Sequence, residues 1–315
     1  MKLTNIIQKV LLCLFFVVFT TFSGTAQIKK EVVKDSIKKE IKDSLAKKSY
    51  FKFASSYLTN YVYNGRKDTI TTPYITSSIG YFNKSGFNTS FSSYYLNAAH
   101  EHRFDFFSFD MNYKHTFNDN FSGSLVASRT FYNNSSNSLS SNIKGDFGAN
   151  IDYDFGFIEL FVESSAVFSH KTDFDLYLEL EHEFSVINGD DEFKITPTFD
   201  INFSTLNYYE GYLNKKIGRK KLTNVDAVVY VDNNKFTLMN YEFSLPMSYE
   251  TNQFVFFVTP TYTIPLNTIN TTTVTTIKLN NGVHQVVSKN STSSIERDLK
   301  QSFFVEFGVF YKFDL

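Results

Sequence analysis

Tryptophan is absent from the 315 residues, and the chain has 1 cysteine and 5 prolines. The cysteine, Cys13, lies in an N-terminal segment that we expect to be cleaved off, so the mature chain is predicted to lack disulfides, thiol nucleophiles and thiolate metal sites. The formal net charge is −1 and no basic stripe is present, which argues against a nucleic-acid partner. Neither a Gly-x-Ser-x-Gly elbow nor a phosphate-binding loop occurs. These absences leave no cofactor to predict.

The sequence also lacks an apolar run of the roughly 20 residues that a transmembrane helix needs. Its longest apolar run covers residues 10–19, follows Lys2 and Lys9, and precedes the small residues Gly24 and Ala26. This order is typical of a secretory signal peptide. We therefore predict a signal peptide over residues 1–26 that is cleaved after Ala26, with an uncleaved membrane anchor as the alternative.

Residues 27–49 differ from the rest of the chain because they are rich in Lys, Glu and Asp and contain no aromatic residue. Apolar residues recur there at near-helical spacing: Ile28, Val32, Ile37, Ile41 and Leu45. The segment is interpreted as a short amphipathic helix or as a charged flexible tether on the periplasmic side.

From Tyr50 onward, apolar and polar residues alternate with a period of two, and the chain is rich in Phe (36) and Tyr (20). In residues 104–117, for example, Phe107, Phe109 and Met111 share one parity while Ser108 and Asp110 share the other. Such strands have one apolar and one polar face. We count about twelve of them, near residues 50–63, 73–82, 87–96, 104–117, 121–132, 143–153, 157–168, 174–186, 193–206, 236–249, 254–266 and 300–313.

Short and long connections alternate between these segments. Every second connection is a tight turn, near residues 83–86, 118–120, 154–156, 188–191 and 250–253, and aromatic residues flank these turns. The others are longer and polar. Short periplasmic turns, long outer loops and aromatic girdles are typical of outer-membrane barrels. The prediction is therefore an all-β fold, an antiparallel transmembrane β-barrel of about twelve strands over residues 50–315.

The alternative fold is a secreted β-sandwich, which also has alternating strands. Four prolines count against regular strands, because each removes a donor from the ladder. They are Pro197, Pro246, Pro260 and Pro265. We interpret them as marking bulges or strand ends within a barrel. Two long loops are predicted to form outer hairpins, one over residues 271–288 and one over residues 225–240.

If the polar parity faces inward, neighbouring strands form an acidic wall in the lumen. Its residues are Asp146, Asp152, Glu159, Glu163, Glu179, Glu181 and Glu183. Folding the two central strands about their loop is predicted to place Glu159 near Glu183 and Glu163 near Glu179. Like charges in such pairs need compensation from Lys194, from the opposite wall, from a bound cation or from water. The wall either favours cations and polar solutes or belongs to a polar network that fills a narrow barrel.

The basic residues predicted to face the lumen are Lys52, Lys114, Lys144 and Lys194. Arg129 shares the apolar parity near the outer rim. It is predicted either to pair with phosphates of surface lipids, as Arg103 and Lys171 could, or to be an ordinary snorkelling side chain.

A catalytic or metal site is not predicted. His115 and His182 fall on the apolar parity near the periplasmic ends and are interpreted as interfacial residues. His100 and His102 flank Glu101 in a short outer loop. A His-x-His pair can ligate a metal, but no matched third ligand accompanies this one.

The first hairpin resembles a known family. It carries Ser55, Ser56 and Tyr57, then Tyr63 to Arg66, the Pro73-led second strand and the Ser85-Gly86-Phe87 turn. This pattern is similar to the opening hairpin of uncharacterised porin-like outer-membrane proteins, although Arg66 here follows Gly65 instead of preceding it. The resemblance covers residues 55–87 and implies a porin-like barrel without a particular substrate.

The predicted function is a passive, porin-like channel in the outer membrane for small polar or cationic solutes. The alternatives are a non-conducting structural or surface-binding barrel and a barrel hydrolase that acts on lipid. The expected partners are outer-membrane lipid, a small polar solute and the barrel-assembly machinery. The last strand, residues 303–315, resembles the C-terminal signal read by that machinery but ends on Leu315 and not on an aromatic residue.

Overall fold

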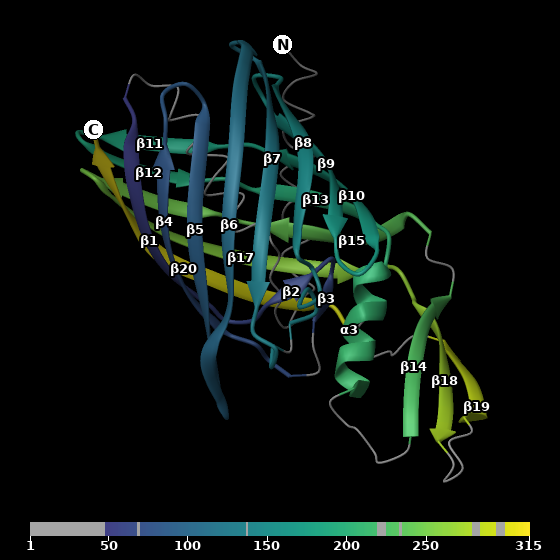
Figure 1. Ribbon diagram of the computed structural model, residues 1–315. Helices are drawn as coiled ribbons and strands as arrows, with labels where there is room; N and C mark the ends of the chain where they lie inside the picture. Colours follow the sequence, from purple (N-terminus) through teal and green to yellow (C-terminus); the bar gives the residue numbers. More distant parts are fainter. Residues whose placement is uncertain are drawn as a thin grey trace.

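A closed antiparallel barrel of 12 strands forms the body of the protein (Figure 1). The computed structural model describes residues 48–67, 70–136, 138–218, 225–232, 235–278, 284–293 and 300–315. The signal peptide predicted for residues 1–26 and residues 27–47 of the predicted charged segment lie outside these ranges. The predicted all-β barrel is confirmed, and the β-sandwich alternative is wrong.

The barrel wall follows the chain order. Its strands are β1 (Tyr50–Leu58), β4 (Tyr74–Phe82), β5 (Phe87–Ala98), β6 (Glu101–Asn118), β7 (Phe121–Tyr132), β8 (Gly145–Asp154), β9 (Glu159–Phe168), β10 (Thr172–Glu181), β13 (Thr198–Ser204), β15 (Thr237–Ser244), β17 (Phe254–Pro265) and β20 (Ser302–Asp314). Strand β20 pairs with both β17 and β1, which closes the wall and leaves no open edge there. These strands match the predicted segments.

Three wall strands are interrupted and continue as short strands. β10 continues as β11 (Phe184–Asn188), β12 (Asp191–Ile195) continues as β13, and β15 continues as β16 (Met247–Thr251). The interruptions meet at one height on neighbouring strands. We call this line the crease; it comprises His182, Glu183, Thr196, Pro197, Leu245, Pro246 and, on β17, Pro260.

Proline explains the crease, because it has no backbone N–H to donate to a neighbouring strand. Three backbone hydrogen bonds cross the crease, and in each the acceptor is a proline carbonyl. They are His182 N to Pro197 O (3.3 Å), Thr196 N to Pro246 O (2.9 Å) and Leu245 N to Pro260 O (3.0 Å). Pro265 ends β17. The prediction that prolines mark strand ends is therefore confirmed for Pro197, Pro246 and Pro265, while Pro260 lies within β17.

Alternation along each strand separates a polar inner face from an apolar outer face. On β8, Phe147 and Ile151 are 54% and 46% exposed, whereas Asp146 and Asn150 are buried. Aromatic residues beside the short turns point outward, as predicted for a girdle, with one exception. Phe82 is buried and stacks on Tyr50, with ring centroids 4.9 Å apart. Among the described residues, no helix is long and apolar enough to cross a membrane.

The long connections lie at one end of the barrel, which we call the outer end, together with two short ones, residues 99–100 and 169–171, which had been predicted to be longer. All connections at the other end are short turns (Figure 1). The outer connections contain β2 (Val62–Tyr63), β3 (Arg66–Lys67), α3 (Asn207–Gly218), β14 (Val225–Asp232), β18 (Asn270–Lys278) and β19 (His284–Ser293). Near the other end, Leu315 N donates to Ser49 O at 2.9 Å, so the two ends of the described barrel meet there.

One of the two predicted outer hairpins is confirmed. Strands β18 and β19 pair antiparallel. The hairpin predicted over residues 225–240 is wrong, because β14 pairs with β18 from Val225 to Asp232 and β15 belongs to the barrel wall. The result is a three-stranded sheet that projects beyond the barrel next to α3 (Figure 1).

Candidate functional site

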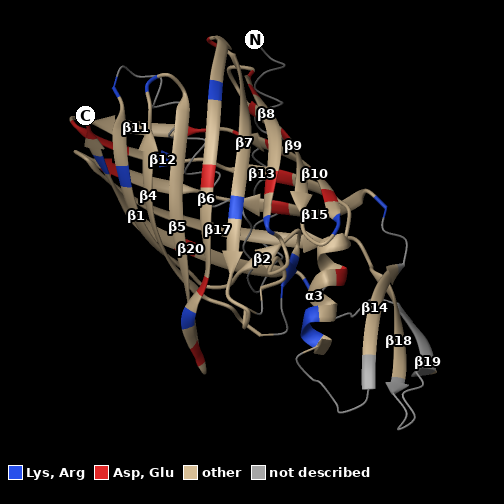
Figure 2. Cartoon of the chain, in the orientation of Figure 1, with Lys and Arg blue, Asp and Glu red and all other residues tan. Residues whose placement is uncertain are grey.

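Seven carboxylates are buried on the inner face of neighbouring strands β8, β9, β10, β13 and β15. They are Asp146, Asp152, Glu163, Asp173, Glu179, Asp200 and Glu242. Figure 2 shows acidic segments recurring along this part of the wall. Of the other predicted acidic residues, Glu159 and Glu181 are half-buried, while Glu183 lies in the crease and is exposed.

The register between β9 and β10 differs from the predicted one. Glu159 lies opposite Glu181 instead of Glu183, and Glu163 lies opposite Tyr177 instead of Glu179. The chain turns over the short connection of Ser169, His170 and Lys171, so the pairing slides by two residues and keeps its inward parity. Glu163 therefore faces an aromatic side chain, whereas Asp200 lies directly across from both Glu179 and Glu242. Like charges remain adjacent in that row, where the Tyr177 Oη donates to Asp200 at 2.6 Å.

Two of the four predicted basic residues lie inside the barrel. The Lys114 Nζ is 3.3 Å from Asp152 Oδ2, and both side chains are buried. Lys52 is buried on β1, with its Nζ 4.1 Å from the centroid of the Phe310 ring. A third, Lys194, is half-buried on the short-turn side of the crease. Its Nζ lies 3.2 Å from Glu183 Oε1, so it compensates the negative charge of Glu183, one of the options predicted from the sequence.

Lys144 was predicted to face the lumen, and this prediction is wrong. It is exposed, whereas its neighbour Ile143 is buried and lines the lumen. Lys144 and Gly145 both lie opposite Phe168. The Lys144 N donates to Phe168 O at 2.7 Å, while Gly145 is the register partner of Phe168. Two residues against one is a β-bulge, which shifts the parity of the strand and turns Lys144 outward.

A cavity of about 170 Å³ occupies the lumen beside strands β4 to β9. This volume is large enough for several water molecules, and it is smaller than the roughly 300–1,000 Å³ of pockets for drug-sized ligands. Toward the short turns it is lined by polar residues such as Asn88, Lys114 and Asp152. Toward the outer end it is lined by aromatic residues, among them Tyr61, Tyr94 and Phe106.

An apolar cluster closes the lumen above this cavity. Inward residues of the wall, including Tyr74, Tyr94 and Phe106, pack against side chains from three connections. We call these connections the outer plug, which comprises residues 59–67, 138–143 and 205–212. Its buried members in the cluster are Tyr61, Tyr63, Leu139, Ile143, Leu206, Tyr208, Tyr209 and Tyr212.

The hairpin β2–β3 is the part of the outer plug nearest β1. Asn64 and Gly65 turn the chain with φ values of 48° and 72°, as two-residue hairpins with positive φ at both central positions require. The turn brings Tyr63 edge-on to Tyr208, with ring centroids 4.8 Å apart. Arg66 is 2% exposed, lies 5.4 Å from the Tyr209 ring centroid, and donates from Nη2 to the carbonyl of Asn267.

Asp105 anchors to the wall the connection that carries residues 138–143 of the outer plug. Its side chain is fully buried and accepts hydrogen bonds from Tyr74 Oη (2.6 Å), Ser136 Oγ (2.7 Å) and Arg103 Nε (2.9 Å). A bulge places it there, because Tyr94 pairs with Phe106 and Tyr95 with Phe104, which leaves Asp105 as the extra residue.

A chain of hydroxyl groups holds the same loop from above. The Ser140 Oγ lies 2.9 Å from Tyr61 Oη, 2.7 Å from Tyr132 Oη and 2.9 Å from Ser138 Oγ. These bonds connect one plug connection to another and to β7. The outer plug is thus held mainly by side-chain contacts. Its ends also bond to the wall through the backbone, from Thr59 N to Val305 O and from Thr205 N to Phe174 O, both at 3.1 Å.

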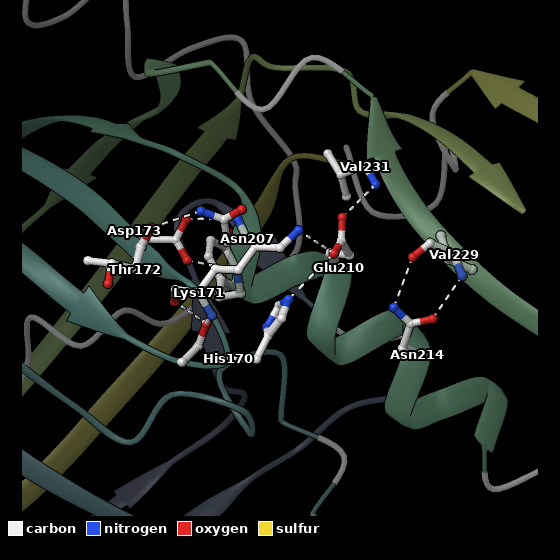
Figure 3. A network of polar contacts seen from close by, with 11 residues as sticks. His170, Lys171, Thr172, Asp173, Asn207, Glu210, Asn214, Val229 and Val231 are labelled. Carbon is white, nitrogen blue, oxygen red and sulfur yellow. Dashed lines mark hydrogen bonds and ion pairs between the residues drawn. The ribbon is translucent and has the colours of Figure 1, made fainter.

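Helix α3 is docked to the barrel mouth through a polar network (Figure 3). Asp173 of β10 accepts from the backbone of Asn207 (2.7 Å) and Tyr208 (2.8 Å), so it caps a helix that begins elsewhere in the chain. Glu210 accepts from Lys171 Nζ (2.8 Å) and from Val231 N (3.1 Å). Asn214 exchanges two bonds with the backbone of Val229.

The pKa of Glu210 is shifted by opposing effects. Burial raises it, but the hydrogen bonds from Lys171, the Val231 amide and His170 lower it, and the net pKa lies below the ordinary value of 4.5. A carboxylate with a lowered pKa in the folded state stabilises that state above its unfolded pKa, and this contribution is lost as the pH falls through the folded pKa.

Docking of α3 is therefore expected to weaken as the pH falls below about 4.5, where Glu210 becomes protonated. Hydrogen exchange of residues 207–218, corrected for the intrinsic effect of pH, measures this. Glu210→Gln should remove the pH dependence, while Glu192→Gln near the short turns should keep it. Equal pH profiles for the wild type and Glu210→Gln would contradict the assignment.

The remaining candidates from the sequence are distributed as follows. Arg103 and Lys171 bind carboxylates of the same chain, because Arg103 pairs with Glu101 (2.6 Å) and Lys171 with Glu210. His115 and His182 lie against the rings of Phe117 and Phe184. Among the described residues, no group of three or more His, Cys, Asp or Glu is arranged to hold a metal ion.

Sequence reasoning did not identify Asp105, Asp173 or helix α3. The helix carries recognisable signals: Glu210 in its first turn, Lys215 and Lys216 in its last turn, and Gly218 at its end. Asp105 and Asp173 have no comparable local signal, since their roles depend on a bulge and on a helix that starts 34 residues later.

The geometry defines the class of protein. A closed antiparallel barrel with an apolar outer face, a polar inner face, short turns at one end and long connections at the other is an outer-membrane β-barrel. An apolar wall of this kind is stable only in lipid, and closure satisfies the backbone there.

No protein-family model matches the sequence, and no curated protein matches it significantly. Solved structures do resemble the fold. A KdgM porin gives a TM-score of 0.42 at 10% identity, covering 84% of this chain and 99% of that one. A NanC porin gives 0.43 at 12% (83% and 98% covered), and LpxR from Salmonella typhimurium gives 0.43 at 11% (82% and 99%). At these scores the likenesses carry no argument about function, and the class rests on the barrel itself.

Proposed function

We propose that the protein is a porin-like barrel for small polar or cationic solutes whose path is closed at the outer end by the outer plug. One observation carries the proposal: a polar, acid-lined lumen lies beneath connections whose aromatic side chains pack together at the barrel mouth. A barrel whose lumen is simply filled by side chains would not need a polar cavity on the short-turn side and a separate aromatic cluster at the outer end.

The charges inside the barrel support a preference for cations. Strands β8 to β15 contribute Asp146, Asp152, Glu163, Glu179, Asp200 and Glu242, and β20 adds Glu306. Buried lysines on the inner face are Lys52 and Lys114, and Lys114 is paired with Asp152. Rings or walls of carboxylates favour cations and disfavour anions. One similar structure is a KdgM porin in complex with oligogalacturonate; a polyanion of that kind is not the solute that we propose here.

Planar-bilayer recording tests the proposal. The wild type should show no steady conductance steps. Replacing residues 60–72 by a short Gly-Ser turn removes Tyr61, Tyr63 and Arg66 from the outer plug, so this variant should show steps with a reversal potential that indicates cation preference. Adding Asp146→Asn and Glu163→Gln should reduce that preference.

The matched control shortens the β18–β19 hairpin, which lies outside the lumen, and should leave the barrel closed. Folding of each variant is verified by its shift in gel mobility on heating. Steady steps in the wild type would contradict closure by the outer plug. A folded plug variant without steps would contradict the porin function.

A second candidate is a non-conducting, surface-binding barrel. It is favoured by helix α3 and the sheet of β14, β18 and β19, which extend beyond the wall at the outer end (Figure 1). Silence of the plug variant in the bilayer experiment would support this candidate.

The delivery of the chain to the membrane is also part of the proposal. Residues 1–26 would direct export with cleavage after Ala26, and residues 27–49 would remain on the periplasmic side. Strand β20 would be recognised by the barrel-assembly machinery. Its position supports this role, because β20 pairs with both β17 and β1 and so completes the wall.

A further inference from the structure

The outer face of strands β6 to β9 is apolar below its outer rim, apart from His115 and Ser164. The outward residues there include Phe109, Leu125, Phe147 and Phe168, and no outward position on these four strands carries a carboxylate. Arg129 on β7 is the exception within this surface, because it is exposed on the outer face. Within the described part of the chain, it has no ion pair.

The β-bulge at Lys144 and Gly145 places a second cation beside Arg129. Gly145 is the register partner of Arg129, and the Thr130 N donates to Lys144 O at 2.8 Å. Strands β7 and β8 approach closely at this point, since a Cβ on Gly145 would lie 2.1 Å from Ser128 O. The bulge therefore turns Lys144, which alternation would place inside, onto the same outer surface as Arg129.

The surroundings of this pair suit a lipid more than a soluble ligand. Arg129 and Lys144 lie at the outer ends of β7 and β8. Phe109 lies directly across from Arg129 on β6, and Phe147 is the next outward residue of β8 toward the short turns; they are 41% and 54% exposed. The Arg129 guanidinium carbon lies 5.4 Å from the centroid of the Phe131 ring, which orients the side chain along the wall.

We propose that Arg129 and Lys144 bind a phosphate group of a phosphorylated glycolipid in the outer leaflet, with its acyl chains lying on the aromatic surface beside them. A guanidinium at the edge of the hydrocarbon layer is unfavourable unless an anion pairs with it. Its planar donors match two phosphate oxygens, and the lysine adds a point charge. The site depends on the barrel standing in the membrane and not on whether its lumen conducts.

Binding of bisphosphorylated lipid A to the folded protein in detergent micelles tests this proposal, with native mass spectrometry as the readout. The double variant Arg129→Gln, Lys144→Gln should bind about tenfold more weakly or worse, as expected when charge-assisted contacts are lost. The matched control Lys84→Gln, Lys235→Gln removes two exposed lysines elsewhere and should bind like the wild type.

Two further measurements separate the sources of phosphate. Dephosphorylated lipid A should bind the wild type as weakly as phosphorylated lipid A binds the double variant. Inorganic phosphate at millimolar concentration should not displace the lipid. Unchanged lipid binding by a folded double variant would overturn the site, and displacement by inorganic phosphate would overturn its assignment to a lipid.

Discussion

Asp105→Ala is expected to lower the free energy of unfolding by about 3 kcal/mol or more, because it removes the buried acceptor of three donors. Tyr74 and Ser136 would lose a partner at a fully buried position, and Arg103 would lose one of its two carboxylates. Urea unfolding from lipid vesicles measures the change. Cleavage by added protease near Ser136 should accelerate as well, since Asp105 fixes that connection to β6.

Two variants control this experiment. Asp105→Asn keeps one side-chain acceptor and should lose less stability than the alanine variant. Asp119→Ala removes an exposed carboxylate from a short turn and should be nearly neutral. If Asp105→Ala unfolds at the same urea concentration as Asp119→Ala, the Asp105 contacts do not hold the outer plug.

Gly308→Val is expected to prevent normal closure of the barrel. Gly308 pairs with Ser56 across the contact of β1 with β20, and a Cβ there would lie 2.4 Å from Ser55 O and 2.8 Å from Ser56 Cα. These are backbone atoms, so the two strands themselves must move apart. Overpacking of this kind destabilises by about 3 kcal/mol or more. The fraction of chains that fold into vesicles, read from gel mobility without heating, should fall sharply.

Gly218→Ala is the matched control, because a Cβ on Gly218 meets nothing within 4 Å. This variant should fold as well as the wild type. Normal folding of Gly308→Val would show that β1 and β20 can separate at Gly308 without loss of the barrel.

The barrel was predictable because its signal is repeated on every strand. Phe109, Met111 and Tyr113 alternate with residues that face the lumen, and the same pattern recurs in each wall strand. Lipid outside the barrel requires apolar residues and water inside it permits polar ones, so the period of two can be read within each strand on its own. The identity of the acidic wall follows from the same rule, although the predicted pairing of its members across β9 and β10 is wrong.

The errors fall where the rule is interrupted. Lys144 was placed inside because nothing nearby in the sequence marks the bulge at Gly145. The β9–β10 register slid by two residues, which parity alone cannot detect. Strand β14 pairs with β18 and not with its neighbour in sequence, and the Asp173 cap that starts α3 comes from β10. Each of these is a tertiary contact between distant segments.

The crease also bears on the stiffness of the barrel. A closed ladder resists bending because each strand is bonded on both sides, but the crease lacks donors at one height on three neighbouring strands. The part below it, made of β11, β12 and β16, is short, and among the described strands β11 pairs only with β12. This part should behave as a cooperative unit of its own that opens at lower free energy than the rest of the cylinder. The rim at the short-turn end on that side would then yield to a force that leaves the outer plug and the acidic wall intact.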